Sequence, residues 1–347
     1  MRIPHCHRAI EIALNLLLVL ATLAGCEGCG CTPTNPDAPP PPYDLGLVPA
    51  SFGIEWPAEP ETDAELVVRS QQDVLNGYFE SNTTLRVVGD LEELVIDADD
   101  VVIAPDQGVR IQSVRIVRGR RRLRFQGGSY GSITFEPPHI LATDDGGFMA
   151  HGMIEDVTFD SITVDDGSPA MAVRGRRVAV LHSYLSSNSM AFFVGDTTPI
   201  PSTDIIVADS VLESAGSGST LVLNQVERSV VVDSWITNPV SFGYVVSGES
   251  DQTFARENVL IGGGASIGDW PGSDVGTAWF IVNRIHHTSV LFGFDLDQVE
   301  HLHLVANAVY SDRVTCAWCP VSVPDAWNVA ANVVRPYEAP PTVPARP

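Results

Sequence analysis

Val207-Ala-Asp-Ser-Val-Leu212 and Val231-Val-Asp-Ser-Trp-Ile236 share one pattern: an apolar residue, two further residues, Ser or Asn, one more residue, and a second apolar residue. The pattern occurs eight times, at intervals of 22, 27, 24, 24, 25, 24 and 25 residues. Self-similarity at such a period is typical of a solenoid, in which each repeat packs on its neighbours. The central residues are Ser161, Ser183, Ser210, Ser234, Asn258, Asn283, Asn307 and Asn332.

The repeats are rich in residues that favour strands and contain no amphipathic helical stretch. Segments such as Asp204-Ile-Ile-Val207 and Val230-Val-Val232 combine β-branched residues with polar bends. About 24 residues suit three short strands and three bends per coil, with coils stacked about 4.8 Å apart. The repeated Ser or Asn is expected to point inward and to bond the coils above and below. We therefore predict an all-β parallel β-helix over residues 85–335.

This periodicity resembles that of the pectate-lyase-like superfamily, whose parallel β-helices carry an asparagine ladder at one turn, and the resemblance implies a right-handed parallel β-helix. The resemblance covers residues 85–335 and implies a long lateral face that binds carbohydrate. An open end of such a solenoid needs a cover, because exposed strands pair with other chains. Thr62 and Glu65 form a capping-box pattern before apolar residues at helical spacing. We predict an N-terminal capping helix over residues 62–79, within a cap of residues 61–84.

The N-terminus is typical of an exported lipoprotein. Arg2 and Arg8 precede a short apolar run, Ile12–Leu23, which suits a signal peptide and is too short to span a membrane. Leu23-Ala-Gly-Cys26 resembles the bacterial lipoprotein box. The resemblance implies cleavage after residue 25 and lipidation of Cys26, and Glu27 then favours the outer membrane or cell surface. A plain signal peptide is the alternative.

Proline-rich sequence follows this box, and two cysteines lie near the far end. Residues 26–60 are predicted to form an extended tether and residues 336–347 a C-terminal tail. In an oxidising compartment Cys316 and Cys319 are most simply a local disulfide. A zinc site shared with tether cysteines and a redox motif are less favoured, the latter because no thioredoxin-like pattern surrounds the pair.

The composition limits the partners. The formal net charge is -23, and all twenty basic residues are arginines. Such acidity opposes binding to nucleic acid or anionic lipid and suits calcium, which prefers carboxylate and carbonyl oxygens. The absence of lysine excludes any mechanism that needs a lysine base. We expect a monomer, with membrane contact through the lipid anchor.

Two pairs of aspartates lie about one coil apart. Asp144 and Asp145 precede His151, and Asp165 and Asp166 follow it. Paired carboxylates can act as general acid and base or hold calcium, and Asp-Gly is also an ordinary turn. Polygalacturonases carry further motifs that are missing here, so a hydrolase of that type is not expected.

Two further groups of charged residues are candidates. The position before each repeat centre carries Asp160, His182, Asp209, Asp233 and Glu257, which is either a calcium-binding column or a row of acidic bends. Arg174, Arg176 and Arg177 echo an earlier arginine cluster, residues 115–124. Pectate lyases pair calcium with an arginine base, so the resemblance keeps a calcium-assisted lyase open. Neutralisation of the acidic surface is the alternative.

The sequence therefore predicts an envelope-anchored β-helix that binds extracellular polysaccharide. It leaves open whether the protein is an enzyme. A catalytic version would be a lyase, epimerase or hydrolase of acidic glycans that uses the Asp pairs and Arg174, Arg176 and Arg177. A third alternative is a structural spacer or adhesin. Fold resemblance carries the carbohydrate expectation, since no catalytic motif is complete.

Overall fold

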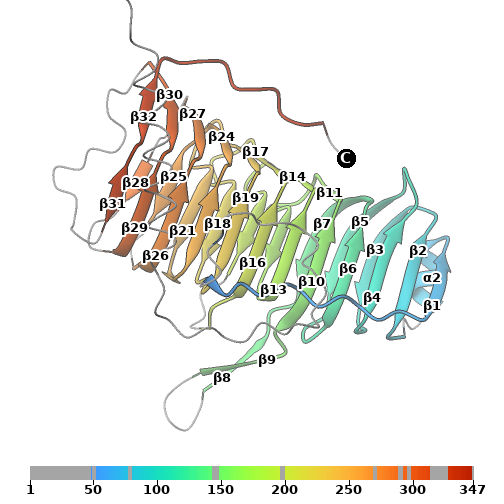
Figure 1. The fold of residues 1–347 in the computed structure, drawn as a ribbon. Helices are drawn as coiled ribbons and strands as arrows, with labels where there is room; N and C mark the ends of the chain where they lie inside the picture. Colours follow the sequence, from blue (N-terminus) through green and yellow to red (C-terminus); the bar gives the residue numbers. More distant parts are fainter. Residues whose placement is uncertain are drawn as a thin grey trace, which may run out of the picture. The chain divides into compact units, whose positions relative to one another are not determined.

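The computed structural model describes residue 48 and residues 52–76, 80–142, 148–195, 200–268, 272–287, 292–294, 298–312 and 327–345. The chain divides into two compact units, Met1–Gly53 and Ile54–Pro347. The signal peptide, Cys26, most of the tether, Asp144, Asp145, Cys316 and Cys319 lie outside the described residues. The second unit is an all-β, right-handed parallel β-solenoid, which confirms the predicted fold class (Figure 1).

One long parallel sheet, here sheet A, forms the first wall of the solenoid. Each strand pairs with the equivalent strand of the next coil, 18 to 27 residues further on, or more where a hairpin intervenes. Its strands are β1 (Ala64–Val68), β2 (Thr83–Val87), β4 (Val101–Pro105), β6 (Arg121–Gln126), β10 (Ile154–Asp160), β13 (Gly175–Leu181), β16 (Thr203–Ala208), β19 (Ser229–Val232), β23 (Thr253–Arg256), β26 (Asp274–Ile281), β29 (Val299–Val305) and β31 (Asn328–Ala330), and β22 (Glu249–Ser250) also pairs with β26.

The second wall, sheet B, follows sheet A in each coil. Its strands are β3 (Leu91–Ile96), β5 (Arg110–Ile116), β7 (Ser129–Phe135), β11 (Thr163–Val164), β14 (Tyr184–Ser187), β17 (Val211–Ser214), β20 (Trp235–Thr237), β24 (Val259–Gly262), β27 (Arg284–His287), β30 (Ala308–Tyr310) and β32 (Val333–Arg335).

The third wall, sheet C, begins where β7 ends. Strand β7 pairs with β11 through Ser129 and Tyr130, and with β12 through Ile133 and Thr134, so one strand divides into two walls. The strands of sheet C are β12 (Met171–Val173), β15 (Phe192–Val194), β18 (Leu221–Asn224), β21 (Tyr244–Ser247), β25 (Ala265–Ile267) and β28 (Phe292–Phe294). A hairpin of β8 (His139–Ala142) and β9 (Phe148–His151) projects between β7 and β10.

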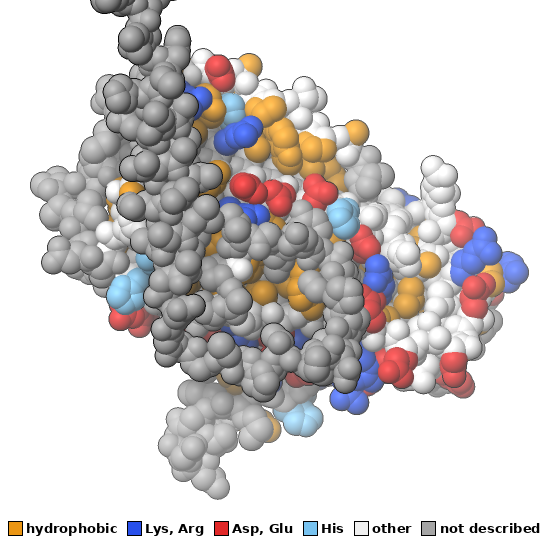
Figure 2. Space-filling model, viewed as in Figure 1, with side chains coloured by type: hydrophobic (Ala, Val, Ile, Leu, Met, Phe, Trp, Pro, Cys, Tyr) orange, Lys and Arg blue, Asp and Glu red, His pale blue; other side chains and the backbone are white. Residues whose placement is uncertain are grey.

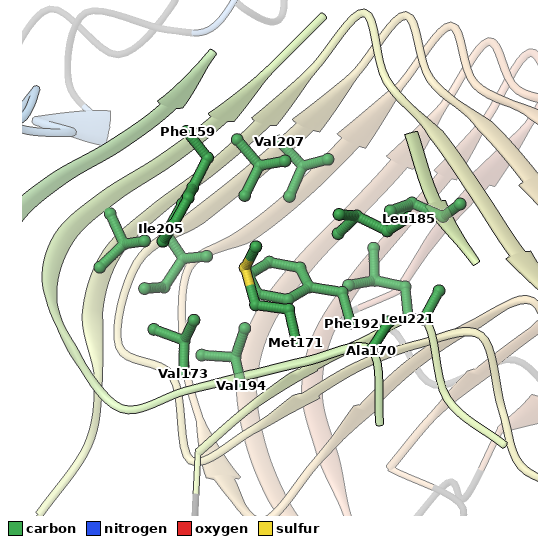
Figure 3. Close-up of a cluster of buried hydrophobic side chains, with 14 of the residues drawn as sticks. Phe159, Ala170, Met171, Val173, Leu185, Phe192, Val194, Ile205, Val207 and Leu221 are labelled. Atoms are coloured by element: carbon green, nitrogen blue, oxygen red, sulfur yellow. The ribbon is translucent and has the colours of Figure 1, made fainter. Parts of the chain in front are cut away.

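Apolar side chains from all three walls meet inside the coils. Phe159 of sheet A, Leu185 of sheet B and Phe192 of sheet C point into one interior, where each is fully buried (Figure 3). Phe125 and Phe159 stack between adjacent coils with ring centroids 4.8 Å apart. Burial of such side chains contributes roughly 1.5–3 kcal/mol each, which makes this interior the main stabilising element.

The predicted polar ladder lies at the bend between sheets A and B, and it runs from Ser183 to Asn332. The backbone N–H at each rung donates to the side-chain oxygen one coil further on, from Ser183 N to Ser210 Oγ (3.1 Å) through Asn307 N to Asn332 Oδ1 (2.9 Å). Each asparagine side chain also donates to a backbone carbonyl, as Asn283 Nδ2 does to Ala255 O (3.1 Å). The ladder thus satisfies buried polar groups that would otherwise destabilise the bend.

The first predicted centre, Ser161, is wrong by one residue. Asp160 pairs with Leu181 and Thr163 with Tyr184, so Ile162 is the residue equivalent to Ser183. Ile162 is buried and its N–H donates to Ser183 Oγ, whereas Ser161 is exposed. This coil advances 21 residues instead of 22, and an apolar residue takes the inward position.

The predicted capping helix is not confirmed. Residues 64–68, which the sequence pattern placed in a helix, form β1 and pair in parallel with β2. A short helix, α2 (Gln71–Asn76), follows, and the carboxylate of Asp73 accepts hydrogen bonds from Arg69 N (2.7 Å) and Ser70 N (3.1 Å). Tertiary pairing with β2 outweighs local helical periodicity here, because it adds a full strand to sheet A.

Candidate functional site

Acidic and basic residues alternate at one position of six consecutive coils, at or beside the start of strands β4, β6, β10, β13, β16 and β19. The strand registers place these residues directly above one another. We call this row the charge column. It consists of Asp100, Arg122, Asp156, Arg177, Asp204 and Arg228.

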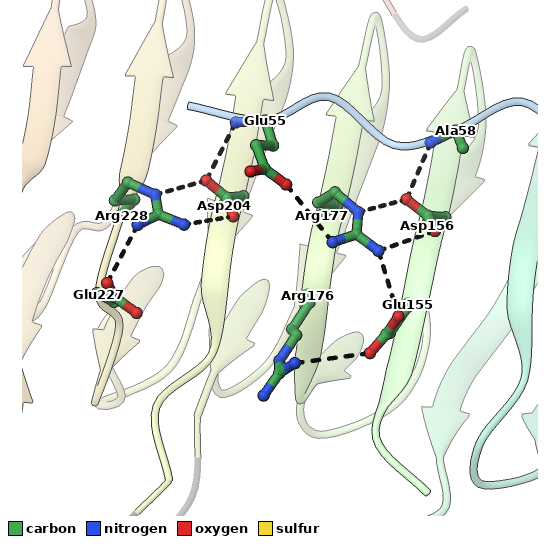
Figure 4. A network of polar contacts seen from close by, with 9 residues as sticks. All are labelled: Glu55, Ala58, Glu155, Asp156, Arg176, Arg177, Asp204, Glu227 and Arg228. Carbon is green, nitrogen blue, oxygen red and sulfur yellow. Dashed lines mark hydrogen bonds and ion pairs between the residues drawn. The ribbon is translucent and has the colours of Figure 1, made fainter. Parts of the chain in front are cut away.

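Each aspartate of the charge column forms a two-pronged ion pair with the arginine of the next coil. Arg228 Nε and Nη2 donate to Asp204 Oδ1 and Oδ2 at 2.8 and 2.9 Å. Arg177 contacts Asp156 in the same way at 2.6 and 3.0 Å (Figure 4). The Asp204 side chain is 2% exposed and that of Arg228 is 24% exposed, so this pair is largely withdrawn from water. Charge-assisted bidentate bonds of this kind are the strong ones.

Asp100 of the charge column makes the solenoid acid-sensitive. Hydrogen bonds from Arg122 hold the pKa of Asp100 below its usual range, although burial opposes this. A depressed folded-state pKa contributes stability above the unfolded pKa, about 3.9 for Asp, and this contribution is lost as the pH falls through the folded value.

Acid denaturation tests this contribution. In urea titrations from neutral pH to below about pH 3, the unfolding midpoint is expected to fall on acidification, with the decline starting near pH 4. The Asp100→Asn variant should be less stable at neutral pH and should decline less steeply. Equal slopes for both proteins would show that Asp100 does not contribute to the acid sensitivity.

A polar hollow of about 390 Å³ lies beside the charge column, at the base of the β8–β9 hairpin. Gly119 and Gly152 form part of its lining, both with positive φ (76° and 82°), and a Cβ on Gly119 would lie 3.3 Å from the Cα of Gly152. Glycine therefore favours this close approach of two loops, because it adopts positive φ readily and adds no Cβ to the contact. The lining residues are Asp99, Gly119, Arg121, Ala150, Gly152, Met153, Glu155 and Arg176.

Two arginines dominate the chemistry of the hollow. Arg121 and Arg176 flank Glu155 on the neighbouring strands of sheet A, with side chains 56% and 47% exposed. Their ion pairs are long: 3.4 Å from Arg121 to Asp99, and 3.8 Å from Arg176 to Glu155. Each guanidinium has five N–H donors, and both side chains are about half exposed to solvent. Figure 2 shows acidic and basic side chains next to one another over the N-terminal coils.

The predicted catalytic residues do not converge among the described positions. Asp165 lies after β11, where it pairs with Arg110 (2.8 Å), and Asp166 accepts a hydrogen bond from Gln112 (3.0 Å). The N–H of Gly167 and the amide of Gln112 lower the pKa of Asp166, which favours its ionised form. Strand β12 separates this bend from the arginine segment.

The three predicted arginines have different environments. Arg174 is buried, with Nη2 donating to Ile200 O (3.3 Å), so it is not placed as a solvent-facing base. Arg177 belongs to the charge column, where its pKa is raised chiefly by hydrogen bonds to Asp156. Only Arg176 faces the hollow.

The proposed calcium column needs a correction. Ser161, and not Asp160, occupies the position equivalent to His182, Asp209, Asp233 and Glu257. Asp160 is instead engaged by Arg124 Nη2 (2.8 Å) and His182 Nδ1 (3.0 Å).

Asp209, Asp233 and Glu257 lie at bends with positive φ. Within the described part of the chain, no group of three or more His, Cys, Asp or Glu residues is placed to hold a metal ion.

Sequence reasoning missed the charge column although its parts were visible. The similar segments Val117–Phe125 and Val173–Leu181 align Arg121 with Arg177 in the sequence. The strand register instead aligns Arg122 with Arg177, so the sequence alignment is wrong by one residue. The acidic partners lie on the intervening coils, and the hairpin insertion before β10 hides their period. Alternating charge near the start of successive sheet A strands is the signal of the charge column, and it can be read only once the register of those strands is known.

No protein-family model matches the chain, and a search of curated proteins finds no relative. Among the described residues, no helix is long and apolar enough to cross a membrane. The class of protein is therefore defined by its fold alone, as a parallel β-solenoid.

Proposed function

We propose that this protein is an exported, lipid-anchored β-solenoid of the bacterial envelope that binds acidic polysaccharide at the Arg121–Arg176 hollow. The observation that carries the proposal is the pair of half-exposed guanidinium groups beside an open, polar depression. The two strands that bear them are two spacings apart in sheet A, roughly 9.6 Å. Guanidinium groups bind carboxylates bidentately, so two uronate carboxylates of one chain suit this arrangement.

The anchoring part of the proposal rests on the sequence. The apolar run before Leu23-Ala-Gly-Cys26 resembles a lipoprotein signal, and likeness to the pectate-lyase-like superfamily supplies the carbohydrate expectation. Binding is favoured over catalysis because Asp165 and Asp166 lie at a different bend from Arg176. The net charge of -23 opposes the long-range approach of an acidic polymer, so specific local contacts must supply the affinity.

Binding to immobilised polysaccharides tests the proposal. The full chain, in detergent, should be retained on polyuronates and not on neutral glucans, without release of reducing ends or unsaturated products. The double variant Arg121→Gln/Arg176→Gln should lose at least tenfold in affinity. Arg86→Gln is the matched control, because Arg86 is equally exposed on sheet A (51%) and is also paired with an aspartate. Equal retention of all three proteins, or retention of none, would contradict the proposal.

A further inference from the structure

An extended segment runs along the charge column, at right angles to the strands (Figure 4). This segment, residues 54–62, is here called the strap. The backbone N–H groups of Glu55, Ala58 and Glu61 donate to single aspartates of the column, at 3.1 Å to Asp204, 3.0 Å to Asp156 and 3.3 Å to Asp100. Figure 4 shows the first two of these contacts. Every third residue of the strap therefore bonds to every second coil.

The period of the strap matches the period of the solenoid. Asp100, Asp156 and Asp204 are each two sheet A strands apart, which corresponds to roughly 9.6 Å. Three residues in polyproline II conformation rise about 9.3 Å. Pro57 and Pro60 favour this conformation in themselves and in the residues before them. The strap can thus keep its register over all three contacts without strain.

Side chains reinforce the backbone contacts. Glu55 lies 3.6 Å from Arg177, and both oxygens of Glu59 accept hydrogen bonds from Arg124 at 2.7 and 2.8 Å. The aspartates are already fixed by their bidentate arginines, so each presents a preoriented oxygen to the strap. The column receives a segment that is acidic, extended and rich in proline.

We propose that the strap opens and closes as one cooperative unit, independently of the solenoid, and that opening moves the point where the N-terminal chain leaves the solenoid. In the closed state the chain leaves beside β16, at Glu55. In the open state it leaves at β1, six strand spacings away. The exit point then shifts by roughly 29 Å along the solenoid.

The physical reason for cooperativity is the shared register. Loss of the middle contact at Ala58 removes the constraint that holds Glu55 and Glu61 opposite their aspartates. The strap is held by part-buried hydrogen bonds from three backbone N–H groups and belongs to neither sheet A nor sheet B, so its opening is expected to cost less free energy than global unfolding. The consequence for the distance between membrane and solenoid rests on the proposed lipid anchor, whereas the opening itself does not.

Residue-resolved amide hydrogen exchange of the full chain tests the inference. In Ala58→Pro, which removes one N–H donor and keeps the extended conformation, the amides of Glu55 and Glu61 should exchange at least tenfold faster than in the wild type. The ladder amides of Asn258 and Asn283 should not change. Ala58→Ser, which retains the N–H, is the control and should match the wild type.

Three results would overturn the inference. Unchanged exchange at Glu55 and Glu61 in Ala58→Pro would mean that the contacts are independent. Unprotected amides in the wild type would mean that the strap is not docked. Strap amides that exchange only as slowly as the ladder amides would mean that the strap opens only with global unfolding. No polysaccharide is used, so failure here is distinct from failure of the proposed binding function.

Discussion

Replacing Asn283 by alanine is expected to lower the free energy of unfolding by about 3 kcal/mol. The Asn283 carboxamide accepts from the backbone N–H and the side-chain amide of Asn258, both at 3.0 Å, and donates to Ala255 O and Asn307 Oδ1, both at 3.1 Å. Alanine would remove the acceptor of the Asn258 backbone N–H in a fully buried bend, and it would take one of two partners from Asn258 Nδ2 and from Asn307 Oδ1. Each unsatisfied buried group costs about 1–3 kcal/mol.

Urea denaturation followed by circular dichroism measures this loss as a lower midpoint. Ser161→Ala is the matched control, because Ser161 precedes the ladder position, is exposed, and should change stability by less than about 0.5 kcal/mol. If Asn283→Ala and Ser161→Ala have the same midpoint, the ladder does not stabilise the solenoid in the way its geometry requires.

Asp204→Asn is expected to destabilise the protein by roughly 2 kcal/mol, because the bidentate pair with Arg228 loses its charge. Asparagine tolerates the positive φ of 58° at this position and can still accept a bond from Glu55 N, so the substitution isolates the ion pair. The 2% exposure of the Asp204 side chain limits screening by water.

The control for this substitution is Asp106→Asn. Asp106 also forms a two-pronged pair, with Arg86, but the two side chains are 41% and 51% exposed, so no measurable change in the unfolding midpoint is expected. A similar midpoint shift in both variants would show that burial does not strengthen the charge column. An unchanged unfolding midpoint in Asp204→Asn would show that the attraction between Asp204 and Arg228 only compensates the cost of removing both charges from water.

The residues that could be predicted from the sequence are those whose role is the same in every coil and therefore repeats along the chain. Ser183 to Asn332 repeat in the chain because every coil needs the same inward polar group at the same bend. The fold class followed from that repetition. The prediction at Ser161 was wrong because this serine fits the sequence pattern, whereas its neighbour Ile162 occupies the inward position.

The residues that could not be predicted depend on contacts between coils or between distant segments. Asp204 and Arg228 lie 24 residues apart in the chain, and only the strand register places one above the other. The contact of Glu55 with Asp204 spans 149 residues and joins the solenoid to a segment whose composition indicates only a tether. The hollow likewise depends on a hairpin whose projection brings Gly152 against Gly119. None of these contacts has a local sequence pattern.

A crystal structure of the protein with a bound acidic oligosaccharide tests the central claim most directly. The account predicts sugar in the hollow at the base of the β8–β9 hairpin, with carboxylate oxygens within hydrogen-bond distance of the guanidinium groups of Arg121 and Arg176. An oligosaccharide bound elsewhere on the solenoid, with both arginines still in contact only with Asp99 and Glu155, would contradict it.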